Sequence, residues 1–452
     1  MRSPLPLLAL LATTPLAAQP APLRVPVTVD TLANGLTLIV HEDRSAPIVS
    51  VNVWYRVGSG DEKPGRTGFA HLFEHLMFMG SQHAPYPEFD RRLEAAGADN
   101  NGSTTEDRTN YFEEGPANAL PLMLWLEADR MGWMLPTMDA PKVDLQRDVV
   151  KNERRQRVEN QPYGLVTDHL PGMLYPAGHP YSWPVIGSMA DLTAASVEDV
   201  KDFFRTYYAP NNASIVVAGD VRAAEVKALV ERYFGAIPRG PAIPRPLPAP
   251  APLARDTALV LEDRVQLPRL YYAFPAVRIG DPDEAALQVV SYLLTDAKNS
   301  RLTRPLVYEE QLASELFSYL DAKRLAGDFT IVATARPGRT LAELQRRIDD
   351  EIVRLAAEGP GTRELEQAKN ALEAQLLREL ERVGSKADRL NACAYFMGKA
   401  DCVQDWLTRL RDVGATDVQR AVRTWLTGPR AVVSVVPQGK RELAAQPRGV
   451  TP

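Results

Sequence analysis

Apolar and polar residues alternate in one short segment near the start of the chain. Residues 48–55 have this period of two, and an apolar run at 36–41 precedes them. Such patterns over a few residues are typical of β-strands that bury one face. We therefore predict strands at 36–41 and 48–55. The buried face of the second strand is expected to carry Val49, Val51, Val53 and Tyr55.

Longer segments have the apolar spacing and composition of helices in both parts of the chain. Asp139 and Pro141 are the expected cap and first turn of one of them. Strands and helices are mixed without a regular strand–helix–strand alternation, which favours an α+β fold over a doubly wound sheet. The predicted helices cover 117–134, 141–160, 197–208, 284–294, 341–358 and 362–381.

The chain divides into two similar halves. A Pro/Ala-rich run at 237–256 has neither strand nor helix periodicity, and this composition favours a semi-rigid spacer. Short motifs recur on either side of it: HEDR at 41–44 returns as LEDR at 261–264, and SIVVAG at 214–219 returns as AVVSVVP at 431–437. These echoes predict a duplicated fold. The expected units are an N-terminal α+β domain at 24–236, the Pro-rich linker at 237–256, a homologous C-terminal α+β domain at 257–440 and a tail at 441–452.

The N-terminal segment is typical of a secretory signal. Arg2 precedes an apolar stretch from Leu5 to Leu16, and the small residues Ala17 and Ala18 follow. The stretch is too short for a permanent membrane anchor, so residues 1–18 are predicted to be a cleavable signal peptide. A frayed N-terminus is the alternative. With a cleaved signal, the protein is expected to be periplasmic in a cell with two membranes and secreted otherwise.

Composition narrows the possible functions. The 452 residues are 45% apolar and 24% charged, which is ordinary for a globular protein, and the formal net charge is −5. Because no block of Lys and Arg occurs, a nucleic-acid partner is disfavoured. The two cysteines, Cys393 and Cys402, are too few for a disulfide scaffold or a thiolate metal site. Export permits a disulfide between them, but their pairing stays open because two helices would have to meet across the intervening turn.

The strongest chemical signal lies at residues 67–80, TGFAHLFEHLMFMG. Apolar residues at spacings of three and four predict an amphipathic helix with one packing stripe. A second stripe carries His71, Glu74 and His75, so two imidazoles four residues apart can hold one ion. This is H-x-x-E-H, the inverse of the usual zinc-protease order. The alternative is an ordinary helix whose polar face happens to carry two histidines. The packing stripe consists of Phe69, Leu72, Phe73, Leu76 and Met77.

Zinc in a hydrolytic site needs a third protein ligand and an open position. The predicted helix at 141–160 is the expected source, and within it Glu153 lies 78 residues beyond His75. From spacing alone, Glu153 is one of several acidic residues that qualify. The residues by themselves therefore leave the third ligand open.

Several motifs in combination resemble the pitrilysin/insulinase family of zinc metallopeptidases, the inverzincins. They are HLFEHLMFMGS at 71–81, Tyr86-Pro87, NNGSTTEDRTNY at 100–111, VVKNERRQRVENQPYG at 149–164 and NSRL at 299–302. The resemblance covers nearly the whole chain after the signal segment. It is greatest to the short bacterial members that are similar to mitochondrial processing peptidase subunits.

The resemblance implies a set of site residues. It implies His71, His75 and Glu153 as ligands of one zinc ion per chain and Glu74 as the general base of an endopeptidase. It also implies that an unfolded peptide adds as a strand beside the zinc, inside a chamber closed by two such chains. The segment DNNGSTT at 99–105 has weak strand propensity, and a loop is the alternative there. The implied substrate-binding residues are Asn101, Gly102 and Ser103.

Two departures from the family pattern bear on activity. Gln146, about two turns before Glu153, stands where many members have a glutamate, so it is expected to support the site without charge or to be a tolerated surface substitution. Val307 and Ser314 stand where active assemblies carry an Arg and a Tyr near the scissile carbonyl. The resemblance therefore implies a heterodimer whose non-zinc homologous subunit supplies this pair. A non-catalytic scaffold and a peptide-holding subunit are the alternatives.

Overall fold

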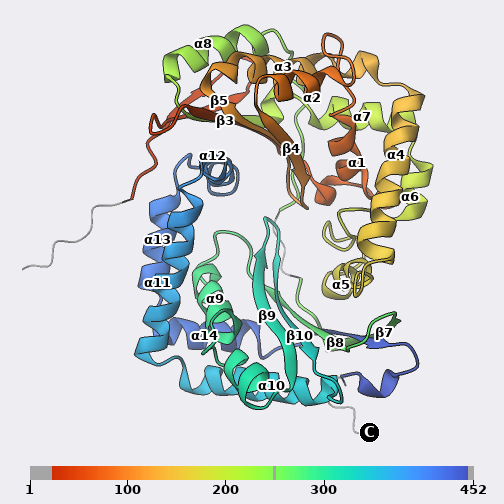
Figure 1. The fold of residues 1–452 in the computed structure, drawn as a ribbon, viewed down its shortest axis with the longest axis vertical. Helices are drawn as coiled ribbons and strands as arrows, with labels where there is room; N and C mark the ends of the chain where they lie inside the picture. Colours follow the sequence, from red (N-terminus) through yellow and green to blue (C-terminus); the bar gives the residue numbers. More distant parts are fainter. Residues whose placement is uncertain (1–22, 248–250, 446–452) are drawn as a thin grey trace, which may run out of the picture.

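The computed structural model describes residues 23–247 and 251–445 (Figure 1). Helices and strands are mixed within two units, so the fold is α+β, as predicted. The predicted signal segment at 1–18 lies outside the described residues. Across the part of the chain that the structure describes, no helix combines the length and apolar character needed to cross a membrane.

The first sheet belongs to the N-terminal half and has the strand order β1-β2-β6-β3-β5-β4. β2 and β6 are parallel, and the other neighbours are antiparallel. β4 lies at the edge of this sheet, so one side of its backbone has no neighbouring strand among the residues that the structure describes. The strands are β1 (Thr28–Thr31), β2 (Thr37–Glu42), β3 (Ile48–Tyr55), β4 (Asp99–Thr104), β5 (Thr109–Pro116) and β6 (Ala213–Gly219).

The second sheet belongs to the C-terminal half and repeats the order of the first. Its order β7-β11-β8-β10-β9 matches β2-β6-β3-β5-β4, with β7 and β11 again parallel. The echoed sequence motifs occupy equivalent strands: they lie at the ends of β2 and β7, and along β6 and β11. The strands are β7 (Thr257–Asp263), β8 (Arg269–Ala276), β9 (Ala313–Ala322), β10 (Gly327–Ala335) and β11 (Ala431–Pro437).

The helices agree closely with the apolar periodicity. The predicted helix at 141–160 is α4 followed by a π-helical turn at Arg155–Glu159, and Asp139 caps it by accepting a hydrogen bond from the Lys142 N–H at 3.0 Å. In the N-terminal half the helices are α1 (Phe69–Leu76), α2 (Glu88–Ala95), α3 (Leu120–Trp133), α4 (Ala140–Arg154), α5 (Val166–Leu174), α6 (Met189–Ala194), α7 (Val197–Tyr207) and α8 (Ala223–Phe234). In the C-terminal half they are α9 (Glu284–Ser291), α10 (Leu341–Glu358), α11 (Thr362–Glu379), α12 (Val383–Ala392), α13 (Val403–Asp412) and α14 (Ala415–Trp425).

Each half places one helix on the sheet of the other half. α12 packs against β3 and β6, and α5 packs against β8 and β11 (Figure 1). The repeated motif, HEDR at 41–44 and LEDR at 261–264, also contacts the opposite half in both of its copies. Asp43 at the end of β2 forms an ion pair with Lys386 of α12, and Asp263 at the end of β7 accepts a hydrogen bond from the Tyr163 N–H at 2.9 Å. The two halves are therefore joined by matched contacts.

β3 is buried on both faces because of this exchange. Its predicted apolar face lies in the core of the N-terminal half. The opposite face carries Ser50, Asn52 and Trp54, which are also buried because α12 covers them. Asp388 of α12 accepts hydrogen bonds from Trp54 Nε1 at 2.9 Å and from Asn52 Nδ2 at 3.4 Å. The polar side of a predicted half-buried strand is thus an interface between the halves.

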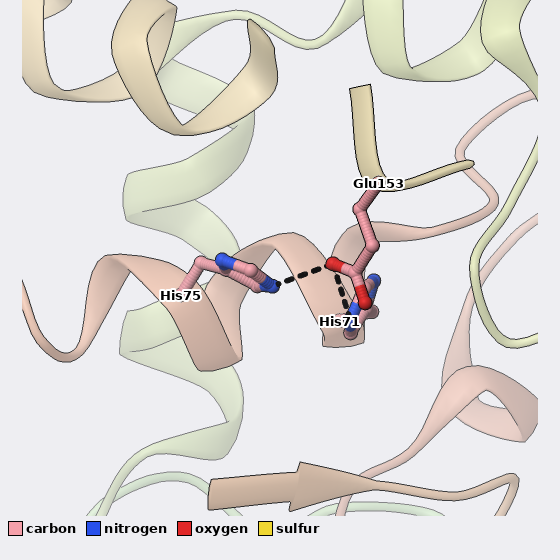
Figure 2. A group of neighbouring side chains, drawn as sticks. All are labelled: His71, His75 and Glu153. Atoms are coloured by element: carbon pink, nitrogen blue, oxygen red, sulfur yellow. Dashed lines mark ion pairs between the residues drawn. The ribbon is translucent and has the colours of Figure 1, made fainter. Parts of the chain in front are cut away.

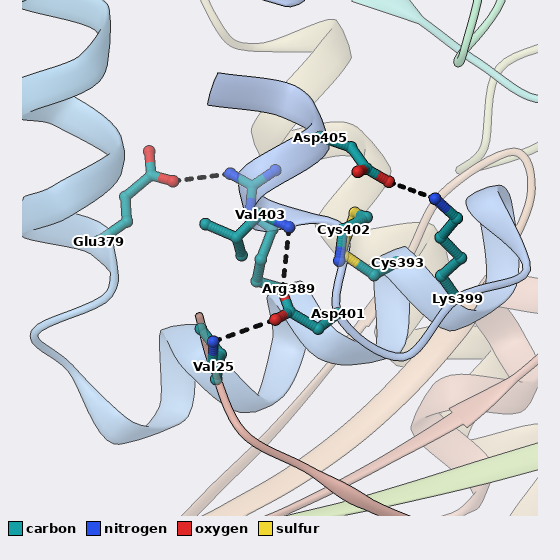
Figure 3. Close-up of a disulfide and its surroundings, with 9 residues drawn as sticks. All are labelled: Val25, Glu379, Arg389, Cys393, Lys399, Asp401, Cys402, Val403 and Asp405. Atoms are coloured by element: carbon teal, nitrogen blue, oxygen red, sulfur yellow. Dashed lines mark hydrogen bonds and ion pairs between the residues drawn. A yellow bond between two sulfur atoms is a disulfide. The ribbon is translucent and has the colours of Figure 1, made fainter. Parts of the chain in front are cut away.

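A disulfide joins Cys393 and Cys402, with an S–S distance of 2.03 Å (Figure 3). Cys393 directly follows α12 and Cys402 directly precedes α13, so two helices meet across the turn. The same turn holds the first described residues, since the Asp401 carboxylate accepts a hydrogen bond from the Val25 N–H at 3.0 Å. The disulfide therefore closes the segment that joins α12 to the rest of the C-terminal half.

The Pro-rich linker lies against both halves. Arg245 forms an ion pair with Asp61 at 2.8 Å and donates a hydrogen bond to Asn212. The carbonyl oxygen of Pro246 accepts a hydrogen bond from Arg324, which lies in the turn between β9 and β10. These contacts hold the described part of the linker in place.

Candidate metal centre

The H-x-x-E-H segment forms α1, and buried polar contacts hold its first turn. Gly68 is the N-cap residue, and its φ of +84° lies in the left-handed region that favours glycine. The buried Glu62 carboxylate accepts hydrogen bonds from the N–H groups of Gly68 at 3.0 Å and Ala70 at 2.8 Å. Burial raises the pKa of Glu62 well above its ordinary range. The direction of α1 is therefore set by contacts that precede the motif.

The packing stripe of α1 orients the motif. As predicted, Phe69, Leu72, Phe73, Leu76 and Met77 are all buried. The Phe73 ring lies 4.3 Å from the Tyr208 ring, centre to centre. With one stripe in the core, the second stripe faces away from it. This stripe brings His71, Glu74 and His75 to the side of the helix that faces α4 and β4.

Glu153 of α4 meets the two histidines (Figure 2). Its Oε2 atom lies 3.2 Å from His75 Nε2 and 3.6 Å from His71 Nε2. Each of the three side chains is mostly buried, with exposed fractions of 12% for His71, 23% for His75 and 15% for Glu153. Among residues 23–247 and 251–445, these three form the one group of three or more His, Cys, Asp or Glu that could hold a metal ion.

The donor atoms fit a zinc ion. Ligands about 2.0–2.2 Å from a tetrahedral ion lie roughly 3.3–3.6 Å apart, and the two Nε2–Oε2 separations are close to this value. Two imidazoles and one carboxylate are also a donor set typical of hydrolytic zinc sites with an open position. Both histidines approach the same carboxylate oxygen with the same ring nitrogen. The geometry therefore suits one shared ion.

The charge states favour metal binding. Burial, followed by the nearby His75, lowers the pKa of His71 to about 4, so its imidazole is neutral at pH 7. The pKa of Glu153 is also lowered, first by the hydrogen bond from His75, so its carboxylate is ionised. A neutral imidazole and an ionised carboxylate are the forms that bind metal ions.

Glu74 lies beside the three candidate ligands but is held by a different partner. Its Oε2 accepts a hydrogen bond from Thr104 Oγ1 of β4 at 2.5 Å. Burial raises the pKa of Glu74, and the bond from Thr104 opposes this shift only in part. A buried carboxylate beside the candidate ligands is suited to accept and release a proton.

Arg154 ties the Glu153 helix to the histidine helix. Its guanidinium donates hydrogen bonds to both oxygens of Asp168 in α5, at 2.8 and 2.5 Å, and to the carbonyl oxygen of Gly187 at 2.9 Å. Gly187 lies directly against Gly68, where a Cβ on Gly187 would come within 2.4 Å of the Gly68 backbone. A continuous set of contacts therefore connects α4 to the first turn of α1. Sequence reasoning missed Arg154 because it reads as one of several basic residues after Glu153.

The segment predicted as a weak strand or a loop is strand β4. Asn101 is exposed on it, and its Oδ1 accepts a hydrogen bond from the Gly102 N–H at 2.8 Å. The carbonyl oxygen of Ser103 accepts a hydrogen bond from Arg108 at 2.8 Å. A Cβ on Gly102 would lie 3.2 Å from Glu74 Cγ, so this strand passes close to the candidate base. The three residues implied as substrate-binding thus line the edge of the sheet nearest to Glu74.

The structure describes all three residues that depart from the family pattern, Gln146, Val307 and Ser314. Gln146 donates from Nε2 to the sulfur of Met79 at 2.8 Å, which is its one side-chain hydrogen bond within the described chain. Val307 lies in a π-helical turn at Arg304–Glu309, and Ser314 in β9 donates to the Thr334 carbonyl. Both of these residues belong to the C-terminal half.

Two family models match the chain. The model described as "Insulinase (Peptidase family M16)" matches residues 37–181, and the one described as "Peptidase M16 inactive domain" matches residues 194–372. Among curated proteins, the chain is 31% identical over 394 residues to the zinc protease PqqE of Helicobacter pylori, which covers 86% of this chain and 85% of that protein. It is 25% identical over 419 residues to a probable mitochondrial-processing peptidase subunit beta of Arabidopsis thaliana, covering 90% of this chain and 78% of that protein.

The chain is also similar to solved structures. A protease from Helicobacter pylori has a TM-score of 0.85 and 28% identity, covering 92% of this chain and 100% of that chain. The first half of the periplasmic protease PqqL from Escherichia coli has a TM-score of 0.74, covering 93% of this chain and 94% of that chain. At 18% identity, this second similarity speaks for the fold alone.

Proposed function

The chain belongs to the insulinase family of peptidases, family M16, and we propose that it is a zinc-dependent endopeptidase that cleaves unfolded peptides. The observation that carries this proposal is the meeting of His71, His75 and Glu153 at 3.2 and 3.6 Å beside a fourth group, Glu74, held by Thr104. Three candidate ligands and a separate carboxylate are the parts that metal-assisted hydrolysis needs.

In this proposal His71, His75 and Glu153 hold one zinc ion. When bound, zinc supplies Lewis acidity that polarises a peptide carbonyl and lowers the pKa of a water molecule. Glu74 accepts the proton of the attacking water on its carboxylate and passes it to the leaving amine. Burial raises the pKa of Glu74, which makes its carboxylate a better proton acceptor than that of an exposed glutamate.

The proposed substrate is an extended peptide that pairs with the free edge of β4. Backbone hydrogen bonds give such pairing its affinity and make it tolerant of sequence. Asn101, Gly102 and Ser103 are the proposed contact residues. Asn101 Oδ1 accepts a hydrogen bond from the Gly102 N–H, so a peptide that pairs with this N–H would replace an existing hydrogen bond.

We propose that the active form is a heterodimer. Donors near the scissile carbonyl often contribute a few kcal/mol to transition-state binding. Val307 and Ser314 provide no Arg and Tyr at the matched positions, so a non-zinc homologous subunit is the proposed source. With the predicted signal peptide at 1–18, both subunits would act in the periplasm or outside the cell.

The test is peptide turnover by the purified chain, with zinc content measured on the same samples. Wild type, Glu74→Gln and the neutral control Glu366→Gln on α11 are incubated with a mixed pool of unfolded peptides, and products are identified by mass spectrometry. We expect Glu74→Gln to keep zinc but to lose at least about a thousandfold in cleavage rate. A zinc-loaded and fully active Glu74→Gln would contradict the role of Glu74.

The partner is tested in the same assay by adding a homologous subunit that carries the Arg and Tyr. We expect zinc-loaded chain alone to be weakly active and the mixture to be active. Strong cleavage by the chain alone would remove the need for a partner. Zinc binding without cleavage in either case would instead favour a scaffold or peptide-holding subunit.

A further inference from the structure

The two faces of β4 have different surroundings. Successive side chains of a strand point to opposite faces. Thr104 and Gly102 face α1: Thr104 bonds to Glu74, and a Cβ on Gly102 would lie 3.3 Å from Phe78 Cε2. The intervening residues, Asn101 and Ser103, therefore face the other side of the sheet.

That other side opens into a cavity of about 1200 Å³. Its floor includes Asn101 and Ser103 of β4 and, across the strand pair, Phe112 and Asn110 of β5, which lie opposite them in register. The opposite wall belongs to the C-terminal half, from the end of α11 and one face of α12. A peptide paired with β4 would point every second side chain into this cavity, because it would continue the same pleat.

The inner end of the cavity is already fixed by hydrogen bonds. Asn110 Nδ2 donates to Asp388 of α12 at 3.0 Å, and Arg108 Nη1 donates to the Ser103 hydroxyl and carbonyl oxygens at 2.6 and 2.8 Å. Asp388 also accepts from Trp54, so the two halves share one network behind the strand. A preformed wall lowers the ordering cost of binding a side chain.

The outer end of the cavity has charged groups of both signs that are not engaged. Asp99 and Glu114 lie directly opposite each other in register, and Arg382 lies at the junction of α11 and α12. Within the described residues, these three side chains make no hydrogen bond or ion pair. Asp99, Glu114 and Arg382 are exposed to solvent. A cavity with these charged groups and several amides favours long polar side chains, because such side chains can bond to the groups that they cover, whereas an apolar one would displace water from them without replacing its hydrogen bonds.

We propose that this cavity is a binding site for alternate side chains of a bound peptide and that it selects long polar ones. The inference rests on the proposed function, because it takes β4 as the edge to which the peptide adds. It assigns the C-terminal half a direct part in substrate choice, through α12. Substrates should therefore show a preference of period two: long polar residues at the positions that face away from Glu74.

Filling the cavity tests this assignment. Ser385→Trp and Ala392→Trp each place a large ring on the α12 wall, and Leu377→Trp on the exposed face of α11 is the matched control. Each is made in the Glu74→Gln chain, so that peptides bind without being cut. The probes are fluorescein-labelled ten-residue peptides of alternating Gln and Ala, Lys and Ala, or Ser and Ala, and binding is measured by anisotropy. Melting temperatures and zinc content identify any variant that fails to fold.

We expect either cavity-filling variant to weaken binding of the Gln and Lys peptides about tenfold and binding of the Ser peptide by less than about twofold. The Leu377→Trp control should change the binding of each peptide by less than about twofold. An equal effect on all three peptides, or none, overturns the inference, as does a failure of every probe to bind. These outcomes do not depend on turnover, which tests the proposed function separately. In an active preparation, the cut-site profile of a randomised peptide pool should lose its period of two in Ser385→Trp.

Discussion

The two halves of the molecule have the same strand order and exchange helices in the same way, yet within the described residues only the N-terminal half carries a candidate metal site. In the N-terminal half, β3 is followed by α1, which carries His71, Glu74 and His75. In the C-terminal half, β8 is the strand equivalent to β3 and is followed by α9. None of the six histidines lies beyond residue 179. α9 is packed by α11, α13 and α14, and almost all of its residues are buried.

This difference shows what the shared fold does and does not determine. The strand order places a helix behind the edge strand in both halves. In the N-terminal half, one face of that helix looks onto β4 and α4, which leaves room for polar side chains. In the C-terminal half, helices close the corresponding faces, so most residues of α9 are apolar and its buried polar residues, Glu284 and Ser291, are hydrogen-bonded within the fold. Chemistry therefore depends on which helix face the later elements leave open.

If the metal site belongs to the N-terminal half alone, removing one of its candidate ligands should cause the largest loss of zinc binding. His75→Ala takes away one of three donors, so we expect zinc affinity to fall by at least about a thousandfold and cleavage to disappear with it. Zinc per chain is measured by atomic emission after dialysis. Gln288→Ala in α9 is the control in the equivalent helix and should keep full zinc content. Stoichiometric zinc in His75→Ala would remove that histidine from the metal site.

Arg154→Met should weaken zinc binding without removing any ligand. Arg154 holds α4 against Gly187 and thus against the start of α1, so its loss frees Glu153 to move relative to the histidines. Outer partners of this kind typically change metal affinity by roughly 10–100-fold. The measurement is a zinc dissociation constant from competition with a chelator, together with the visible spectrum of the cobalt-substituted chain.

Arg155→Met is the matched control, because Arg155 is exposed and bonds to Asn152 within its own helix. It should bind zinc as wild type does. If Arg154→Met has wild-type zinc affinity while Glu153→Gln has lost it, the contact through Gly187 does not position the ligand.

The local pattern of apolar and polar residues was sufficient to predict many of the helices and strands of this fold. The strand at Ile48–Tyr55 and the helix at Leu341–Glu358 have the bounds that periodicity predicts, and the core stripe of α1 is buried as expected. The H-x-x-E-H spacing places two histidines on one face of a helix with no further information. These features depend on residues only a few positions apart, which is why sequence reasoning reaches them.

Other features depend on contacts across long separations. The choice of Glu153 among the acids of α4 followed from family resemblance, because spacing alone left it open. The bond between Asp388 and Trp54 spans 334 positions, and nothing around either residue indicates the other. The polar face of β3, with Asn52, reads as solvent-exposed until α12 is placed on it. Sequence patterns describe each half well and say little about how the halves meet.

Substitution of Asp388 should weaken the interface between the two halves. Its carboxylate accepts hydrogen bonds from Asn52, Trp54 and Asn110, so Asp388→Ala leaves three buried or partly buried donors without this partner. We expect a loss of about 2–3 kcal/mol in the free energy of unfolding. Urea unfolding followed by tryptophan fluorescence measures it. Asp412→Ala at the exposed end of α13 is the control and should change stability by less than about 0.5 kcal/mol.

The smallest expected effect concerns the echoed motif itself. Asp43 pairs with Lys386, and the hydrogen bond from that lysine, followed by one from Ser45, lowers the pKa of Asp43 below its ordinary value. A carboxyl whose folded pKa is lowered stabilises the fold fully above its unfolded pKa of about 3.9 and loses this stabilisation as the pH falls further. Because the pair is near the surface, we expect about 0.5–1 kcal/mol at pH 7.

The measurement is the difference in unfolding free energy between wild type and Asp43→Asn, taken from pH 7 down to pH 3. The difference should be constant to about pH 5 and shrink below about pH 4, since protonation then makes wild-type Asp43 resemble the amide. A double-mutant cycle with Lys386→Met should recover most of the effect as coupling between the two residues. A difference that grows toward low pH, or a coupling of zero, would mean that this contact does not hold α12 against the N-terminal sheet.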